Sequence, residues 1–134
     1  MGSNRRQPFG ALLGPLEADV MGVVWDRGDV TVRDVHEVLG EDRRLAYTTV
    51  MTTMGRLVDK RLLARAESER AHRYSALVSR EQYGRKVTKS VLDWLVGQFR
   101  DPAVAYFVDR LEEEDMRLVE SLRRVIEQRA EADG

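Results

Sequence analysis

The sequence predicts a mainly α-helical protein with one small β-hairpin, and three observations support this fold class. Apolar residues recur at helical spacing along most of the 134-residue chain, and Gly or Pro stands where the pattern breaks. Residues 62–78 differ, with a weak alternation on either side of a turn-like stretch. Charged residues make up 34% of the chain, a proportion typical of amphipathic helices in a globular protein. The length suits one small domain, or one such domain with an oligomerisation arm.

Composition excludes several classes of protein. The chain has no cysteine, which removes disulfides, thiolate metal sites and cysteine nucleophiles. Its two histidines, His36 and His72, make a poor metal site without cysteines. The sequence shows no Gly-rich phosphate loop and no cluster of catalytic residue types, so we expect no enzyme activity, cofactor or bound metal. It also has no apolar run of membrane length and no signal peptide, so we expect a cytoplasmic protein without membrane insertion.

The first helix is expected to follow a short arm. Residues 1–10 lack periodicity and predict a flexible N-terminal arm. The helix begins at Pro15, because proline is favoured in the first helical position. Its apolar stripe includes Val20 and Val24, and Gly28 stops it. We interpret these apolar residues as core residues.

The second helix is short and has a clear start signal. Thr31 is typical of a helix cap, with Asp34 three residues later as its reciprocal partner. His36 is expected to pack beside the buried face of this helix. Gly40 is expected to end the helix, and the polar residues 41–44 then predict a brief connection to the next one.

The stretch 45–62 predicts a third helix with two distinct faces. Val50, Met54 and Leu57 form an apolar face at helical spacing. The other face carries short hydroxyl side chains and one arginine: Thr48, Thr49, Thr52, Thr53 and Arg56. Exposed helix faces usually carry better helix formers than threonine. This face favours a DNA major groove, where hydroxyls contact phosphates or base edges and arginine binds guanine. A half-buried helix whose threonines face a neighbouring element is the alternative.

A hairpin follows this pair of helices. Residues 62–67 and 72–78 predict two strands around a turn. Two helices joined by a brief connection form a helix-turn-helix, and the hairpin makes the predicted fold a winged helix. Arg70, His72 and Arg73 then lie where the wing meets the DNA backbone. An exposed hairpin without a partner would carry the same residues.

Basic charge gathers around the predicted recognition helix. The chain as a whole has a net charge of −1, which by itself argues against a nucleic-acid binder. Residues 43–75, however, hold eight Lys and Arg against three Asp and Glu, whereas residues 79–134 hold ten against twelve. This distribution favours binding to a polyanion through the first of these segments.

From Ser79 onward the pattern predicts long amphipathic helices, interrupted at Asp101-Pro102. Such helices can hardly bury their apolar faces within one chain, so a second copy is the economical partner. The predicted dimerisation residues are Val87, Val91, Leu95, Phe99, Phe107, Leu111, Leu118, Leu122 and Ile126. The predicted domains are the flexible arm (1–10), a winged-helix DNA-binding domain (11–78) and a helical dimerisation region (79–134).

Three stretches together resemble the penicillinase repressor family, the BlaI/MecI type of winged-helix repressors. They are LGPLEADVMGVVW at 13–25, AYTTVMTTMGRLVDKRLL at 46–63 and RAHRYSALVSREQY at 70–83. The first looks like the family's opening helix, the second like its recognition helix and following strand, and the third like its wing. The similarity covers about residues 12–126. LAYTTVMT with RAHRY is its most specific part, and the C-terminal region matches by pattern.

The resemblance implies a homodimer that binds double-stranded DNA at a dyad-symmetric operator, through the recognition helix (46–60) and the wing (68–74). The candidate DNA-binding residues are Thr31, Tyr47, Thr48, Thr49, Met51, Thr52, Arg56, Lys60, Arg70, His72 and Arg73. Met51 replaces a residue that is basic in some members. Ala46 stands where a capping hydroxyl is often found, which predicts a weaker helix start.

The resemblance also implies a signal. In antibiotic-responsive members, a membrane sensor protease cuts an Asn-Phe bond in the C-terminal helices, and the genes repressed are β-lactam-response or related genes. That bond falls here on Tyr106 and Phe107. Tyrosine replaces asparagine, so either the protease specificity differs or the signal is not proteolytic. Copper-responsive members carry C-terminal cysteine pairs, which this chain lacks.

Two other functions fit the same residues. One is a ligand-responsive winged-helix regulator whose dimer region binds a small molecule near Trp94, Phe99 and Tyr106. The other is a protein-interaction module without a DNA role, in which the threonine face is a docking surface. Binding to the protein's own upstream DNA separates the second alternative from the others.

Overall fold

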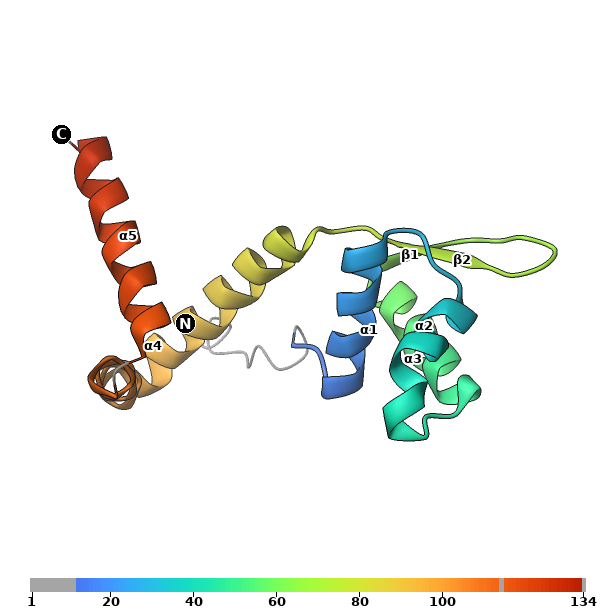
Figure 1. Ribbon diagram of the computed structural model, residues 1–134. Helices are drawn as coiled ribbons and strands as arrows, with labels where there is room; N and C mark the ends of the chain where they lie inside the picture. The colour runs from blue at the N-terminus through green and yellow to red at the C-terminus, as the bar shows by residue number, and fades with distance from the viewer. Residues whose placement is uncertain (1–11, 114, 134) are drawn as a thin grey trace. The chain divides into compact units, whose positions relative to one another are not determined.

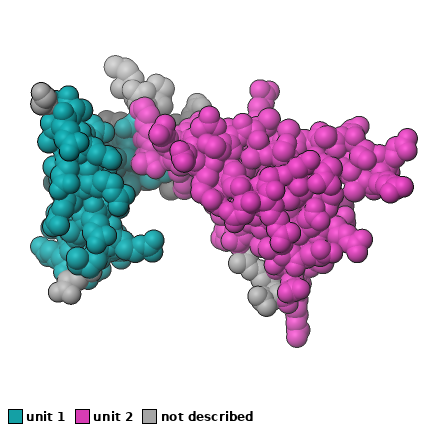
Figure 2. Space-filling view, turned by 45° about the horizontal axis from the view of Figure 1, so that its top comes forward, with its two compact units in different colours: residues 1–7, 91–134 teal, residues 8–90 magenta. Residues whose placement is uncertain are grey.

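The structure is a computed structural model that describes residues 12–113 and 115–133, apart from the side chains of residues 42 and 43. In this part of the chain the elements are α1 (Pro15–Arg27), α2 (Val32–Arg43), α3 (Tyr47–Asp59), β1 (Leu63–Ala66), β2 (Arg73–Ala76), α4 (Arg80–Glu112) and α5 (Met116–Asp133) (Figure 1). The chain divides into two compact units, and the division falls between Ser90 and Val91, inside α4 (Figure 2). The expected fold class, helical with one hairpin, is confirmed. The predicted arm at 1–10 lies outside the described residues.

Helix α1 begins and ends as its sequence predicts. Pro15 takes the first helical position, and the Gly14 N–H donates to the Glu17 carboxylate at 3.0 Å. The helix stops at Gly28, whose φ of 87° lies in the region that favours glycine. The Gly28 N–H donates to the Val24 carbonyl at 2.7 Å and so satisfies one of the last carbonyls of the helix.

Helix α2 confirms its predicted start but not its predicted end. The Asp34 N–H donates to the Thr31 hydroxyl at 3.1 Å, and the Thr31 N–H donates to the Asp34 carboxylate at 2.9 Å. This capping box also lowers the pKa of Asp34, chiefly through the backbone hydrogen bond from Thr31. The helix continues through Gly40 to Arg43, and Arg44 at its C-cap adopts a left-handed conformation with φ of 49°. The prediction that Gly40 ends the helix is therefore wrong.

Gly40 has a packing role instead. A Cβ at this position would stand 3.1 Å from His36 Nε2 and 3.2 Å from its Cδ2. The His36 ring uses this space to place Nε2 at 2.7 Å from the Leu45 carbonyl, in the turn between α2 and α3. Because a carbonyl only accepts, Nε2 carries the proton in this contact. His36 therefore packs as expected, and it also holds the turn that leads into α3.

Helix α3 lies at the centre of the hydrophobic core of the compact unit that ends at Ser90. Val50, Met54 and Leu57 are fully buried, which confirms the predicted apolar face. The remaining core side chains come from α1, α2, the segment before α2, and the hairpin: Val20, Met21, Val23, Val24, Val30, Val32, Val35, Leu63 and Tyr74. Ala46 provides no side-chain hydrogen bond at the start of α3, as expected for alanine. The position of α3 thus depends on packing rather than on its cap.

The hairpin pairs β1 with β2 in antiparallel register, with Leu63 opposite Ala76 and Ala66 opposite Arg73. Val30 extends this sheet: its N–H donates to the Tyr74 carbonyl at 3.0 Å, and the Tyr74 N–H donates back at 2.7 Å. The loop between the two strands projects beyond the helices of the same unit (Figure 1). This arrangement of three helices and a projecting hairpin is that of a winged helix.

The C-terminal helices have no buried residue among those the structure describes. Helix α4 contains one break, at Phe99, where φ is −141° and ψ is 51°. The sequence places the interruption at Asp101-Pro102, and the structure places it slightly earlier. The reason is that Pro102 lacks an N–H and its ring clashes with the carbonyl four residues before it. The helical backbone therefore deforms in the turn that precedes the proline. Helix α5 is capped by Asp115, which accepts from the Leu118 N–H at 3.1 Å.

Candidate nucleic-acid interface

The exposed face of α3 carries most of the predicted recognition residues. Thr48, Thr49, Thr52 and Arg56 are all exposed, on the side of the helix that faces away from the core. Thr53 is an exception, because it is only 4% exposed and its hydroxyl donates to the Thr49 carbonyl at 2.8 Å. Grouping Thr53 with the polar face is therefore wrong. It follows Val50 by three positions and so falls on the buried side of the helix.

The start of α3, the cap of α2 and the wing meet at one cleft. Tyr47 and Met51 project from the first turns of α3, and both are exposed. They line a cleft of about 330 Å³ with Thr31, Arg70 and His72. These five residues come from three separate segments, and each was a candidate from the sequence. The fold brings them together beside the exposed threonines of α3.

Two of the basic residues predicted to bind DNA, Lys60 and Arg73, form ion pairs with carboxylates of the same unit. The Lys60 ammonium lies 2.9 and 3.0 Å from the two oxygens of Glu17 on α1. Arg73 pairs with Asp29, with 3.1 Å from Nε to the carboxylate and 3.1 Å from its terminal nitrogen to the Asp29 carbonyl. Neither residue lines the cleft. Their positive charges are thus partly compensated within the unit.

In the ion pair between Lys60 and Glu17, Glu17 is the more buried partner. Its side chain is 13% exposed. Burial by itself raises the pKa of this carboxyl, but the hydrogen bond from the Gly14 N–H and the ammonium of Lys60 outweigh burial. The pKa of Glu17 therefore lies below its ordinary value of 4.5. Arg56, one turn before Lys60, adds a further lowering charge.

Arg33 is a residue of this cleft that sequence reasoning missed. It stands in the first turn of α2, lines the cleft and forms an exposed ion pair with Glu37 at 3.2 Å. Ser68 and Glu69 of the wing line the same cleft. The signal for Arg33 in the sequence is its outward helical position two residues after the cap, which the apolar pattern of the helix does not reveal.

The predicted dimerisation residues lie on α4 and α5. Phe99, Phe107 and Ile126 are exposed. The other six are half-buried: Val87, Val91, Leu95, Leu111, Leu118 and Leu122. An apolar groove of about 810 Å³ forms on α4 around its break and brings together Leu95, Phe99, Tyr106 and Phe107. The Trp94 ring packs edge-on against Phe99, with ring centres 5.6 Å apart.

The chain matches the penicillinase repressor family over residues 13–128. It is 38% identical to the transcriptional regulator BlaI of Mycobacterium tuberculosis over 119 residues, which cover 85% of this chain and 82% of that protein. The chain belongs to the penicillinase repressor family. The penicillinase repressor of Staphylococcus aureus is 26% identical over 110 residues, 82% of this chain and 86% of the relative. A solution structure of the DNA-binding domain of the repressor BlaI aligns at 22% identity and a TM-score of 0.48, covering 53% of this chain and 87% of that one.

Membership of the penicillinase repressor family makes the protein a transcriptional repressor, not an enzyme. The resemblance drawn from the three motif stretches is thereby confirmed. None of the helices in the described chain has the length and apolar character needed to cross a membrane. Across residues 12–113 and 115–133, no three His, Asp or Glu side chains gather in a way that would hold a metal ion.

Proposed function

We propose that this family member is a homodimeric repressor that binds a dyad-symmetric operator, with α3 in the major groove of each half-site. The observation that carries the proposal is the two-sided character of α3. Val50, Met54 and Leu57 anchor one side in the core, and Thr48, Thr52 and Arg56 project from the other. A helix anchored in this way holds its exposed side chains at fixed positions, which base readout requires.

The exposed hydroxyls also weigh against the alternative in which the threonines face a neighbouring element. Only Thr53 has that environment. The exposed threonines offer hydroxyl donors to phosphates and methyl groups to thymine, and Arg56 offers a bidentate donor pair to guanine. In this proposal Arg33 and Arg70, which line the cleft, contact the DNA backbone that flanks the groove.

The dimer in this proposal is formed by the C-terminal helices. Their apolar side chains stay largely in contact with solvent in a single chain, and exposed apolar patches of this kind mark interaction surfaces. A second copy is the simplest partner, since a two-fold dimer presents two copies of α3 to two half-sites. The family consists of repressors. When a dimer binds two half-sites together, it gains affinity that binding to one half-site does not supply.

We further propose that repression of β-lactam-response or related genes in the cytoplasm is relieved by a membrane sensor protease that cuts between Tyr106 and Phe107. Both side chains are accessible, at 67% and 44% exposed. The bond lies within α4, so cutting requires local unfolding, which the nearby break at Phe99 favours. Cleavage would separate α5 from the winged helix and thereby weaken the dimer.

Intact-mass analysis of the protein from cells exposed to a β-lactam tests the cleavage step. Two fragments that meet between Tyr106 and Phe107 are expected while the target genes are derepressed. A full-length mass under derepression would contradict cleavage. That result would favour a small-molecule signal, for which the apolar groove on α4 is the observation in support.

A mobility-shift assay on the protein's own upstream DNA tests operator binding. Arg56→Ala is expected to lower specific affinity about fivefold to 150-fold, or about 1–3 kcal/mol, because it removes one bidentate base contact. Arg129→Ala, an exposed arginine of α5, is the matched control and should bind like the wild type. Equal operator binding by Arg56→Ala and wild type at one salt concentration would refute this docking face. No shift with the wild type would favour a protein-interaction module.

A further inference from the structure

Lys60 continues the row of exposed side chains on α3. Thr48, Thr52, Arg56 and Lys60 follow one another at a spacing of four residues, and all four are exposed. Lys60 stands at the C-cap of the helix, where its N–H donates to the Arg56 carbonyl at 2.9 Å. It therefore lies at the end of the face that we propose to contact DNA, in a place where an ammonium would meet the phosphate backbone.

The ammonium of Lys60 is already bound by Glu17 of α1. Its Nζ lies 3.0 and 2.9 Å from the two carboxylate oxygens, so both oxygens accept from the ammonium. These residues lie 43 positions apart in sequence, and their contact depends on the packing of α1 against α3. The carboxylate uses donors of Lys60 and compensates the charge that would attract a phosphate.

Glu17 is fixed on its own side of this pair. Its side chain is 13% exposed, and one of its oxygens accepts from the Gly14 N–H at 3.0 Å. If Lys60 left the pair, a largely buried carboxylate would lose its cation, and such a loss is costly. Burial raises the pKa of this carboxyl, but the Gly14 hydrogen bond and Lys60 bring the pKa below its ordinary value. Glu17 is therefore ionised at neutral pH and holds Lys60 continuously.

The ion pair of the wing differs from this pair in burial. Arg73 and Asp29 have side chains that are 48% and 60% exposed, and ion pairs in such positions are weak. A DNA phosphate can replace Asp29 without leaving a buried charge unpaired. The pair between Lys60 and Glu17 resists the same replacement, because its carboxylate is largely buried.

We propose that Glu17 is an intramolecular competitor of DNA, which keeps the Lys60 ammonium from the phosphates and so limits the affinity of the protein for any DNA. This inference rests on the proposed function, since it takes α3 as the helix that contacts DNA. Affinity from phosphate contacts does not depend on sequence. Limiting these contacts weakens binding to non-operator DNA, which a genome offers in large excess.

A purely structural ion pair between α1 and α3 is the competing role for Glu17. Both roles predict that Glu17→Gln lowers the stability of the fold, because the pair with Lys60 is lost. A structural pair alone predicts unchanged or weaker DNA binding by the variant. A competitor predicts tighter binding by a less stable protein. Tighter binding is thus the readout that a structural role does not produce.

The test uses full-length protein and fluorescence anisotropy on the protein's own upstream DNA and on a duplex of random sequence, at several salt concentrations. Glu17→Gln is expected to bind both duplexes about three- to tenfold more tightly at ~0.1 M salt, because Lys60 then neutralises one further phosphate. The slope of log affinity against log salt concentration should steepen by about 0.9 for the same reason. Glutamine keeps a side-chain oxygen for the Gly14 N–H, so the start of α1 is preserved.

Two further variants separate release of Lys60 from a contact that it already makes. Lys60→Gln should weaken binding, because it leaves the charge of Glu17 uncompensated near Arg56. The double variant Glu17→Gln with Lys60→Gln replaces a compensated pair by two neutral side chains, and it should bind within about twofold of wild type. The double variant also serves if Glu17→Gln alone does not fold, because it leaves no charge unpaired.

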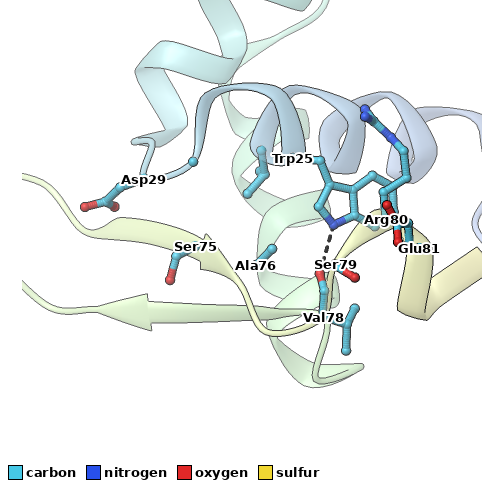
Figure 3. A pocket seen from close by; sticks show the side chains of 10 residues that line it. Trp25, Asp29, Ser75, Ala76, Val78, Ser79, Arg80 and Glu81 are labelled. Atoms are coloured by element: carbon cyan, nitrogen blue, oxygen red, sulfur yellow. Dashed lines mark hydrogen bonds between the residues drawn. The ribbon is translucent and has the colours of Figure 1, made fainter.

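Glu81→Gln is the control for the change in net charge. Glu81 is exposed and lines a different pocket of the same unit, where the Trp25 indole N–H donates to the Val78 carbonyl at 2.9 Å (Figure 3). This pocket shares no lining residue with the cleft beside α3. Glu81→Gln should therefore bind both duplexes within about twofold of wild type.

Unchanged or weaker binding by a folded Glu17→Gln would overturn the inference, and so would equal tightening by Glu81→Gln. A double variant that binds about threefold or more weakly than wild type would overturn it as well, because Lys60 would then already contact a phosphate in the wild type. A wild type that does not bind its upstream DNA more tightly than the random duplex would overturn the proposed function. That failure is recognised in the wild-type data alone, before any variant is compared.

Discussion

Replacing Gly40 with alanine tests whether the His36 ring holds the turn before α3. Gly40 lies inside α2, where alanine normally stabilises a helix by about 0.5–1 kcal/mol relative to glycine. Here the added Cβ would stand 3.1 Å from His36 Nε2 and 3.2 Å from Cδ2. Carbon atoms pack at about 3.5–4.0 Å, so the ring must move by a few tenths of an ångström.

The ring has little freedom to move. Its Nε2 lies 2.7 Å from the Leu45 carbonyl, and its edge-on neighbour Tyr47 has its ring centre at 5.8 Å. Losing a hydrogen bond of this kind costs about 0.5–1.5 kcal/mol. The loss is as large as the helical gain, so Gly40→Ala should be neutral or destabilise the protein by up to about 1 kcal/mol. In a His36→Ala background the same change should stabilise by about 0.5–1 kcal/mol.

The double-mutant cycle consists of the wild type, Gly40→Ala, His36→Ala and the double variant. Urea unfolding of these four proteins gives the coupling free energy between positions 36 and 40. A Trp94→Phe background leaves Trp25 as the fluorescence probe within the winged-helix unit. The expected coupling between positions 36 and 40 is about 0.5–1.5 kcal/mol. If Gly40→Ala stabilised both backgrounds equally, with a coupling below about 0.3 kcal/mol, the His36 ring would not be held as described.

Two further predictions concern the same unit. The lowered pKa of Glu17 stabilises the fold above the ordinary carboxyl value of 4.5, and this contribution is lost as the pH falls through the lower folded value. The unfolding free energy of wild type should therefore exceed that of Glu17→Gln at pH 7 and approach it as the pH falls below 4.5 and through the lowered pKa of Glu17, measured by urea titration; a pH-independent difference would contradict this. A fragment ending at Ser90 should unfold cooperatively and sediment as a monomer, whereas one ending at Val78 should be less stable by about 1–2 kcal/mol, because it loses the aromatic and cationic partners of Trp25. Equal stability of the two fragments, or a dimeric Ser90 fragment, would contradict that prediction.

The domain boundary shows where sequence pattern stops being informative. The change from alternation to helical period predicts a boundary between 78 and 79. That residues 11–78 form a separate domain stays a prediction. Arg80 and Tyr83 contact Trp25 on α1, and the division between compact units falls after Ser90. Periodicity identifies a helix but not the element against which its first turns pack.

Features that depend on residues a few positions apart can be predicted from the sequence alone. The capping box of Thr31 and Asp34, the start of α1 at Pro15 and the buried face of α3 all follow from spacings of about three or four residues. The exposed Thr48, Thr52 and Arg56 face follows from the same period. These short-range rules held because caps and helix faces are local properties of the backbone.

Features that join distant segments become visible only in the folded protein. Lys60 meets Glu17 across 43 positions, Arg73 meets Asp29 across 44 and Trp25 meets Val78 across 53. Gly40 reads as a helix end from its residue type alone, yet it lies inside α2, where the His36 ring occupies the space that a Cβ would need. Such contacts arise when packing brings remote surfaces together, and neither periodicity nor residue preference carries that information.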